Sequence, residues 1–442
     1  MTEPAETKSS PAEAAATDRA SADTAAIGCA SAKAAGTSCA VEASDARCDA
    51  EAAGANCAPA EAAGANCAPA EAAATACTSA EAAAANHPVA ELRPNQRTRR
   101  VMVGGVPVGG GAPVAVQSML NAPADDVAAN LAQIDALAQA GCEIVRMAIP
   151  RRACLDAFAA VCEASPLPVV ADVHFDPVIA IEAARRGAAK LRINPGNIGG
   201  LAATDAVLDA AGEAGIPIRI GVNAGSLDQE LASRTDLTLP QKLAASAAQY
   251  VAYCESRGFS DLVVSAKAHD VMTTVRTYRQ LATDIPHVPL HIGVTEAGTA
   301  FQGTIKSAAG LGILLEEGIG DTMRISLTDD PAVEVRACWT LLSALDLRRR
   351  NPELISCPTC GRCQVNLIDL AKQVEARLSG VASPVKVAVM GCVVNGPGEA
   401  ADADIGVACG AGSGIVFRNG ETIRKVAEDQ IVDALMEEIE SL

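Results

Sequence analysis

The sequence has few aromatic residues and no excess of basic ones. Phe, Trp and Tyr make up 2% of the 442 residues, and the formal net charge is −18 at pH 7. Proteins that bind nucleic acid usually carry a basic face, and single strands are usually held by stacking on aromatic side chains. These two shortages exclude nucleic acid as an expected partner.

Long hydrophobic runs are also missing, although 50% of the residues are hydrophobic. No run approaches the ~20 apolar residues that a membrane-spanning helix needs, so we expect no membrane segment. The first residues, MTEPAETKSS, lack the basic start and apolar stretch of a secretory signal peptide. We therefore expect a cytoplasmic protein in which most of the 16 cysteines are free thiols.

Residues 1–92 differ in composition from the rest of the chain. EAAGANCAPA occurs at 51–60 and again at 61–70, looser copies follow, and six cysteines recur about every ten residues. Ten residues are too few for a helical solenoid repeat, and alanine alone buries too little surface for a core. We predict a disordered Ala/Cys-rich extension. A metal- or thiol-handling role for the spaced cysteines is the alternative.

Beyond residue 100, short apolar runs alternate with helical patterns. A helix often opens with Asp and closes with Gly, as in 126–141 and 176–187. Eight strand–helix units over roughly 250 residues predict a TIM (β/α)8 barrel, which we assign to residues 93–348. A doubly wound sheet is the alternative, but its usual GxGxxG turn does not follow the first strand. The expected strands are 113–119, 143–149, 167–175, 189–195, 216–223, 261–267, 289–295 and 321–327.

Polar and basic residues stand near the ends of these strands, where barrel enzymes place their active groups. A buried strand is normally almost wholly apolar, yet five of these strands carry a cation within an acidic chain. We interpret them as a positive pocket for a polyanion, with a diphosphate as the expected ligand. Structural ion pairs are the alternative, and His174 can equally be a core histidine. The residues are Arg146, His174, Arg192, Asn194, Arg219, Asn223, Ser265, Lys267, Arg324 and Ser326.

Two of these side chains have further chemical possibilities. Glu296 follows the seventh strand and is the one acid that the sequence places among the cations. It is either a general acid or base or a counter-ion to an arginine. Lys267 can form a Schiff base, so a barrel aldolase or synthase is kept as an alternative.

Two short cysteine motifs lie in the last hundred residues: SCPTCGRC at 356–363 and GCVVNGPGE at 391–399. Three thiolates and one carboxylate form an uneven ligand set, whereas four thiolates are typical of closed zinc or cluster sites. An oxygen donor binds soft iron less tightly, which favours an iron with an exchangeable position. A zinc ribbon needs a second CxxC, and none follows. Cys363 extends the first motif to CxxCxxC and is the rival third ligand.

The two motifs resemble the pair of cluster-binding motifs of the 4-hydroxy-3-methylbut-2-enyl diphosphate synthase (IspG/GcpE) family. The resemblance rests on CPTCGR followed by GCVVNGPGEA and covers roughly residues 97–442. Cys363 and the N-terminal extension depart from the family pattern. Further blocks occur in the family's order: VGGVPVGGGAPVAVQSM, VADVHFD, LRINPGNIG, IPIRIGVNAGSL, HIGVTEAG and GLGILLEEGIGDTMRISL.

The resemblance implies the bacterial two-domain type, with a small α/β iron–sulfur domain over residues 349–442. Within this domain, residues 385–394 predict a strand and 431–442 a terminal amphipathic helix. One 4Fe–4S cluster per chain is implied, with a labile iron ligated by Glu399. The implied ligands are Cys357, Cys360, Cys392 and Glu399.

The implied reaction is the reductive ring opening and dehydroxylation of 2-C-methyl-D-erythritol 2,4-cyclodiphosphate to (E)-4-hydroxy-3-methylbut-2-enyl diphosphate. Flavodoxin or ferredoxin would supply the electrons, and Glu296 and Glu399 would be catalytic. Homodimers are implied, in which one chain's cluster caps the other chain's barrel. A phosphate-binding barrel with a structural zinc domain is the alternative from another class. The implied substrate contacts are Arg146, His174, Arg192, Asn194, Arg219, Asn223, Lys267, Arg324, Ser326 and Asn395.

Overall fold

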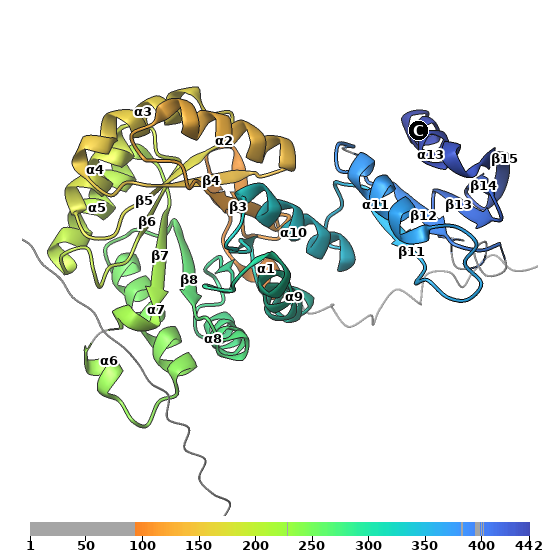
Figure 1. Cartoon of the computed structure of the whole chain (residues 1–442). Helices are drawn as coiled ribbons and strands as arrows, with labels where there is room; N and C mark the ends of the chain where they lie inside the picture. The colour runs from red at the N-terminus through yellow and green to blue at the C-terminus, as the bar shows by residue number, and fades with distance from the viewer. Residues whose placement is uncertain (1–92, 228, 382, 394–397, 399, 401) are drawn as a thin grey trace, which may run out of the picture. The chain divides into compact units, whose positions relative to one another are not determined.

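The computed structural model describes residues 93–442 apart from 228, 382, 394–397, 399 and 401 (Figure 1). The prediction of a disordered extension over 1–92 lies outside the described residues. Two predicted site residues, Asn395 and Glu399, lie outside them as well.

Eight parallel strands form the predicted barrel. Hydrogen bonds join them in the order β8-β7-β6-β5-β4-β3-β10-β9. A parallel bridge between Val264 and Leu290 links the two ends of this order, so the sheet closes on itself. Each strand falls within one of the eight predicted runs, and the barrel prediction is confirmed. The strands are β3 (Ala115–Met119), β4 (Ile144–Ala148), β5 (Val169–Asp172), β6 (Lys190–Ile193), β7 (Ile218–Asn223), β8 (Leu262–Lys267), β9 (His291–Ile292) and β10 (Thr322–Met323).

A helix follows each barrel strand (Figure 1). The caps are those expected from the sequence: Asp126 accepts a hydrogen bond from the backbone N–H of Ala129, and Gly141 ends the same helix at φ 98°. The short helix α6 (Gln229–Ser233) is additional, as are 3-10 turns at Arg152–Cys154 and Ala224–Ser226. The principal helices are α2 (Val127–Ala140), α3 (Leu155–Ala164), α4 (Pro177–Arg185), α5 (Leu201–Ala214), α7 (Leu239–Ser256), α8 (Val271–Asp284), α9 (Ala300–Glu316) and α10 (Pro331–Ala344).

A hairpin that the sequence analysis did not predict packs against the N-terminal ends of the strands. Helix α1 (Pro94–Arg97) precedes it, and its strands are β1 (Val101–Val103) and β2 (Val106–Val108). Its valines form one buried cluster with the residues that begin β3 and β4, Ala115 and Ile144. An apolar plug at this end leaves the opposite, C-terminal end for polar chemistry, as is usual in TIM barrels.

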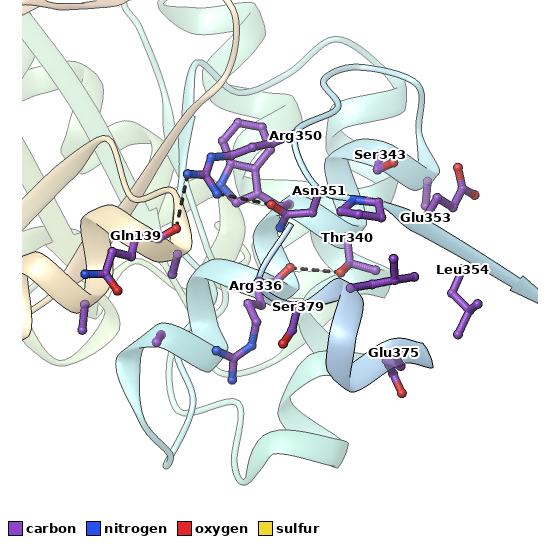
Figure 2. A pocket seen from close by; sticks show the side chains of 18 residues that line it. Gln139, Arg336, Thr340, Ser343, Arg350, Asn351, Glu353, Leu354, Glu375 and Ser379 are labelled. Carbon is purple, nitrogen blue, oxygen red and sulfur yellow. Dashed lines mark hydrogen bonds between the residues drawn. The ribbon is translucent and has the colours of Figure 1, made fainter. Parts of the chain in front are cut away.

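The chain leaves the barrel along a segment that is tied to it. Helix α10 ends at Ala344, and Asp346 takes a left-handed conformation at φ 53°. The guanidinium of Arg348 lies 4.6 Å from the centre of a Trp339 ring. Arg350 donates to the backbone oxygen of Gln139 at 3.3 Å (Figure 2). Any hinge between the barrel and the following domain therefore begins after Arg350.

The described C-terminal residues form a five-stranded mixed sheet with the helices α11 and α13, as the predicted small α/β domain requires. The sheet order is β11-β12-β13-β14-β15, parallel across the first three strands and antiparallel across the last three. The predicted strand and terminal helix of this region are found as β12 and α13. The elements are β11 (Glu353–Ser356), α11 (Leu367–Leu378), β12 (Lys386–Met390), β13 (Ile405–Gly410), β14 (Ser413–Arg418), β15 (Glu421–Ala427), a 3-10 turn (Glu428–Gln430) and α13 (Ile431–Glu440).

In the part of the chain that the structure describes, no helix is long and apolar enough to cross a bilayer.

Candidate active site

Cations from neighbouring barrel strands come together inside the barrel. Arg192 on β6 lies in register with Arg219 on β7, and Asn223 on β7 lies in register with Lys267 on β8. Alternate residues of a strand share one face, so Arg219, Gly221 and Asn223 all point to the same side of the sheet. Arg219 is 1% exposed and Arg192 7%. The strands therefore hold these charges out of water, where they attract an anion more strongly than at a surface.

Asp172, at the end of β5, is the acid that lies among these cations. Its carboxylate is 3.2 Å from Arg192 Nη1, 3.5 Å from His174 Nε2 and 3.8 Å from Arg146 Nε. Burial alone would raise the pKa of Asp172, but the two arginines and His174 outweigh that effect and lower it. The interpretation of Glu296 as the one acid among the cations was wrong. Asp172 was missed because it stands inside an apolar run, although a carboxylate there is itself a signal.

Arg324, just past β10, already has a counter-ion. Its Nε and Nη2 donate to the two carboxylate oxygens of Glu334 at 3.1 and 3.0 Å. Glu334 is 2% exposed and also accepts from the hydroxyl of Ser118 and the backbone N–H of Leu327. For this arginine, the alternative of a structural ion pair holds within the described structure.

Two glycines make room for the cations, Gly221 within β7 and Gly293 just after β9. A Cβ atom at Gly221 would lie 2.7 Å from Arg192 Nε, and one at Gly293 would lie 2.7 Å from Lys267 Nζ. Glycine inside a strand normally weakens it, so its presence often marks a close approach. Here the missing side chains let Arg192 and Lys267 extend across the adjacent strand.

Lys190 and His291 lie deeper in the barrel, and the sequence analysis missed both. Each is fully buried, and among the described residues Lys190 Nζ and His291 Nδ1 have no hydrogen-bond partner. Burial, and then the charge of Arg219, lowers the pKa of both groups and of Lys267. Lys190 stands two residues before Arg192 on one strand, so the period of two in AKLRINP was the signal that could have found it.

The other predicted barrel residues are spread around the ends of the strands. The side chain of His174 is 42% exposed, whereas Asn194 is buried and its Oδ1 accepts from the backbone N–H of Gly196. Asn223 is exposed, Ser326 is half-buried, and Ser265 donates weakly to a backbone oxygen.

Glu296 and a neighbouring pocket complete this end of the barrel. Glu296 is exposed and has a left-handed backbone at φ 53°, which is rare for a residue other than glycine. A pocket of about 360 Å³ opens beside His174, lined by Met119, Ile149 and Phe175 among others.

The two cysteine motifs follow neighbouring parallel strands of the C-terminal domain. Ser356 at the end of β11 lies in register with Val389 near the end of β12. Cys357 and Cys392 therefore begin loops at the same edge of the sheet. The backbone N–H of Gly391 donates to Cys357 Sγ at 3.2 Å, and a Cβ at Gly391 would lie 2.7 Å from Cys363 Sγ. The residue before Cys392 thus touches the sulfurs of the first motif.

The donor types at this edge fit an iron–sulfur group. Cys360 is exposed and Cys357, Cys363 and Cys392 are half-buried, whereas Cys409 is buried and burial raises its pKa to about 12. Soft thiolates within reach of solvent suit iron–sulfur clusters. Among the described residues, no three His, Cys, Asp or Glu side chains are already grouped to hold a metal ion. Cys363 Sγ instead donates to the backbone oxygen of Val365 at 3.3 Å.

Family models match both parts of the chain. The GcpE TIM-barrel domain matches residues 98–339, and the GcpE protein C-terminal domain matches residues 353–441. The chain belongs to the GcpE family.

Several GcpE relatives are about half identical to this chain. A Geobacter sulfurreducens protein is 54% identical over 346 residues, which are 78% of this chain and 98% of that protein. A Maridesulfovibrio salexigens protein is 51% identical (78% and 96%), and a Corynebacterium jeikeium protein is 50% identical over 352 residues (79% and 91%). All three are named 4-hydroxy-3-methylbut-2-en-1-yl diphosphate synthase (flavodoxin).

Membership of the GcpE family confirms the resemblance drawn from the sequence. The family consists of iron–sulfur enzymes that form 4-hydroxy-3-methylbut-2-enyl diphosphate in the non-mevalonate isoprenoid pathway. The fold found here, a barrel followed by a small C-terminal domain, is the one that the family implies.

Proposed function

We propose that the protein reductively opens 2-C-methyl-D-erythritol 2,4-cyclodiphosphate and removes a hydroxyl group, giving (E)-4-hydroxy-3-methylbut-2-enyl diphosphate. One observation carries the proposal for this chain. Arg146, Arg192, Arg219 and Lys267 meet inside one barrel, and Asp172 is the acid that lies among them. Since arginine does not lose its proton, such a site needs an anion to balance it.

In this proposal, residues 93–348 bind the substrate. Arg192 and Arg219 offer forked donors that match phosphate oxygens, and Lys267 adds a compact charge. Arg324 is held by Glu334 and orients rather than neutralises the ligand. The proposed contacts are Arg146, His174, Arg192, Asn194, Arg219, Asn223, Lys267, Arg324, Ser326 and Asn395.

Residues 349–442 form the redox domain in this proposal. Cys357, Cys360, Cys392 and Glu399 would hold one 4Fe–4S cluster, which supplies electrons singly when bound. Glu399 is the oxygen donor of the set and is expected to bind iron least tightly. Cys363 is the rival third ligand because its sulfur lies against Gly391. All of these thiols need to stay reduced, which fits the cytoplasm.

Activity and colour test the proposal together. Anaerobically purified protein should be brown and should consume the cyclodiphosphate when reduced flavodoxin or ferredoxin is supplied. The relatives' name makes flavodoxin the first donor to try. A colourless protein that contains zinc and leaves the cyclodiphosphate intact would refute it.

Glu296 is proposed as the general acid or base. Replacing it with Gln keeps the size of the side chain and its backbone conformation but removes the titrating group. We expect turnover to fall about 10²–10⁴-fold, the range for general acid–base catalysis, with little change in KM. Steady-state kinetics check this, with Glu316→Gln, an exposed glutamate at the end of α9, as the control. Equal changes in kcat and KM would make Glu296 a binding residue instead.

The protein is further proposed to be a homodimer in which the C-terminal domain of one copy covers the barrel of the other. Large apolar side chains are exposed after the strands and at the starts of the outer helices: Phe175 is 75% exposed, Phe301 78%, Leu201 55% and Ile305 55%. Exposed apolar patches of this kind often mark an interface.

Mixing two inactive variants tests the shared site. Arg219→Met disables the barrel, and Cys392→Ser disables the redox domain. If each site combines one barrel with the partner's redox domain, a mixed dimer regains one intact site, so statistical exchange should restore about a quarter of the wild-type activity. The control is each variant mixed with itself. If subunits have been shown to exchange and the mixture is still as inactive as each variant alone, the active site is not shared between subunits.

A further inference from the structure

Lys267 is held between His291 on β9 and Gly293, the first residue after that strand. On one side Gly293 leaves space, since a Cβ there would lie 2.7 Å from Lys267 Nζ. On the other side His291 Nε2 lies 3.3 Å from the same nitrogen. The lysine therefore reaches across the neighbouring strand and ends on the imidazole.

The position of His291 is fixed by contacts on its backbone. Tyr278, from α8, donates its hydroxyl proton to the backbone oxygen of His291 at 2.6 Å and accepts from the backbone N–H of Ala266 at 3.2 Å. Tyr278 and His291 are both fully buried. One tyrosine thus joins the strand of the lysine to the strand of the histidine, and the distance between their side chains is set by the fold.

The surroundings of His291 keep its ring neutral. Burial is the main cause of its lowered pKa, followed by the charges of Arg219, Lys267, Lys190 and Arg146. A neutral imidazole has one acceptor nitrogen, whereas an imidazolium has none. An ammonium can only donate, so when Lys267 is charged Nε2 is the acceptor in this contact, and the ring proton then lies on Nδ1.

We propose that His291 is a positioning residue that accepts one hydrogen bond from the ammonium of Lys267 and thereby aims its other two protons at an anionic group of the substrate. The inference rests on the proposed function and adds a residue to it. His291 does not touch the anion. It stabilises the charged form of Lys267 in a place where Arg219, Arg146, Arg324 and Arg192 all oppose that charge.

Two substitutions separate this role from packing. His291→Gln carries an amide that reaches the position of Nε2, whereas His291→Asn carries the same amide but stops short of it. Inorganic pyrophosphate is the probe, titrated calorimetrically into anaerobically purified holoenzyme between pH 6 and 9. We expect the His291→Gln variant to bind pyrophosphate within about twofold of wild type. The His291→Asn variant should bind it about tenfold more weakly, the loss expected for one missing hydrogen bond to a charged group.

The pH profile and a double variant complete the test. Pyrophosphate binding requires protonated Lys267, so it should weaken as the pH rises through the pKa of that lysine. In His291→Asn this midpoint should move to lower pH, because the ammonium has lost its acceptor. Lys267→Met should remove the part of the pH dependence that belongs to the lysine and leave only that of pyrophosphate itself, and adding His291→Asn to it should weaken binding no further.

Additive losses in the double variant would overturn the inference, as would equal binding by the Gln and Asn variants. Thermal melting shows whether each variant is folded. If the His291→Asn variant does not fold, the affinities of the His291→Gln and His291→Met variants for pyrophosphate are compared instead. Failure of this inference and failure of the proposed function can be told apart. A holoenzyme that shows this coupling but leaves the cyclodiphosphate unchanged would refute the reaction and keep the positioning role.

Discussion

Replacing Cys392 with Ser should reduce turnover to background and remove the visible absorption of the protein, while both domains stay folded. A serine hydroxyl remains protonated at neutral pH and is a poor ligand for iron, whereas a thiolate is a strong one. Cys392 follows a strand whose valines, Val387 and Val389, belong with Val407 to a buried cluster that does not include Cys392. The measurements are iron and sulfide per chain, the visible spectrum and the thermal transition.

A matched cysteine makes this result specific. Cys162 lies half-buried on α3 of the barrel, and burial raises its pKa to about 12, so Cys162→Ser should keep iron, colour and activity. Cys363→Ser decides between the two candidate third ligands. If that variant loses iron while Cys392→Ser retains a full cluster, the proposed ligand set is incorrect.

Replacing Arg219 with Met should weaken substrate binding about 100-fold without lowering the stability of the unliganded protein. Two charge-assisted hydrogen bonds to an anion are worth about 3 kcal/mol together, even at the low end for such bonds. In the unliganded protein, however, Arg219 is buried and its Nε and Nη1 have no partner among the described residues. Burial and the charges of Arg146 and Arg192 disfavour its cationic form, which is seen as a lowered pKa. Methionine removes that repulsion and fills much of the same space.

Arg324→Met is the informative contrast. Arg324 is the partner of Glu334, and removing one member of a buried ion pair typically costs about 3–5 kcal/mol because the other charge is left unpaired. This variant should therefore melt at lower temperature than wild type, while Arg219→Met should not. Arg279→Met, at an exposed pair with Glu317, should change neither property. If the Arg219→Met variant is less stable but binds substrate normally, the role of Arg219 is structural. Calorimetric titration and thermal unfolding give both quantities.

The barrel could be predicted from the sequence because its strands are short, apolar and regularly spaced. The hairpin of β1 and β2 was not predicted: three residues per strand are too few to show a period, and its glycines resemble an ordinary loop. Its role depends on contacts with Ala115 and Ile144, which are distant in the sequence.

The cationic site was predictable only in part. Arg192, Arg219 and Lys267 stand at strand ends, where a polar residue is conspicuous. Asp172 and His291 were missed because a single polar residue in an apolar run resembles a satisfied core residue. Only the closed barrel shows that Asp172 faces two arginines and that His291 faces Lys267. These strands are consecutive in the chain, but a helix separates each from the next, so which side chains face one another has no local signature.

The edge shared by β11 and β12 has a consequence for how the protein matures. Cys357 and Gly391 are 34 positions apart, and the whole of α11 intervenes. The halves of the proposed ligand set are brought to one edge of the sheet by the pairing of β11 with β12. If this set holds the cluster, its complete form exists only in a domain whose two strands have already paired, and a scaffold that donates clusters would meet a folded surface rather than an extended peptide.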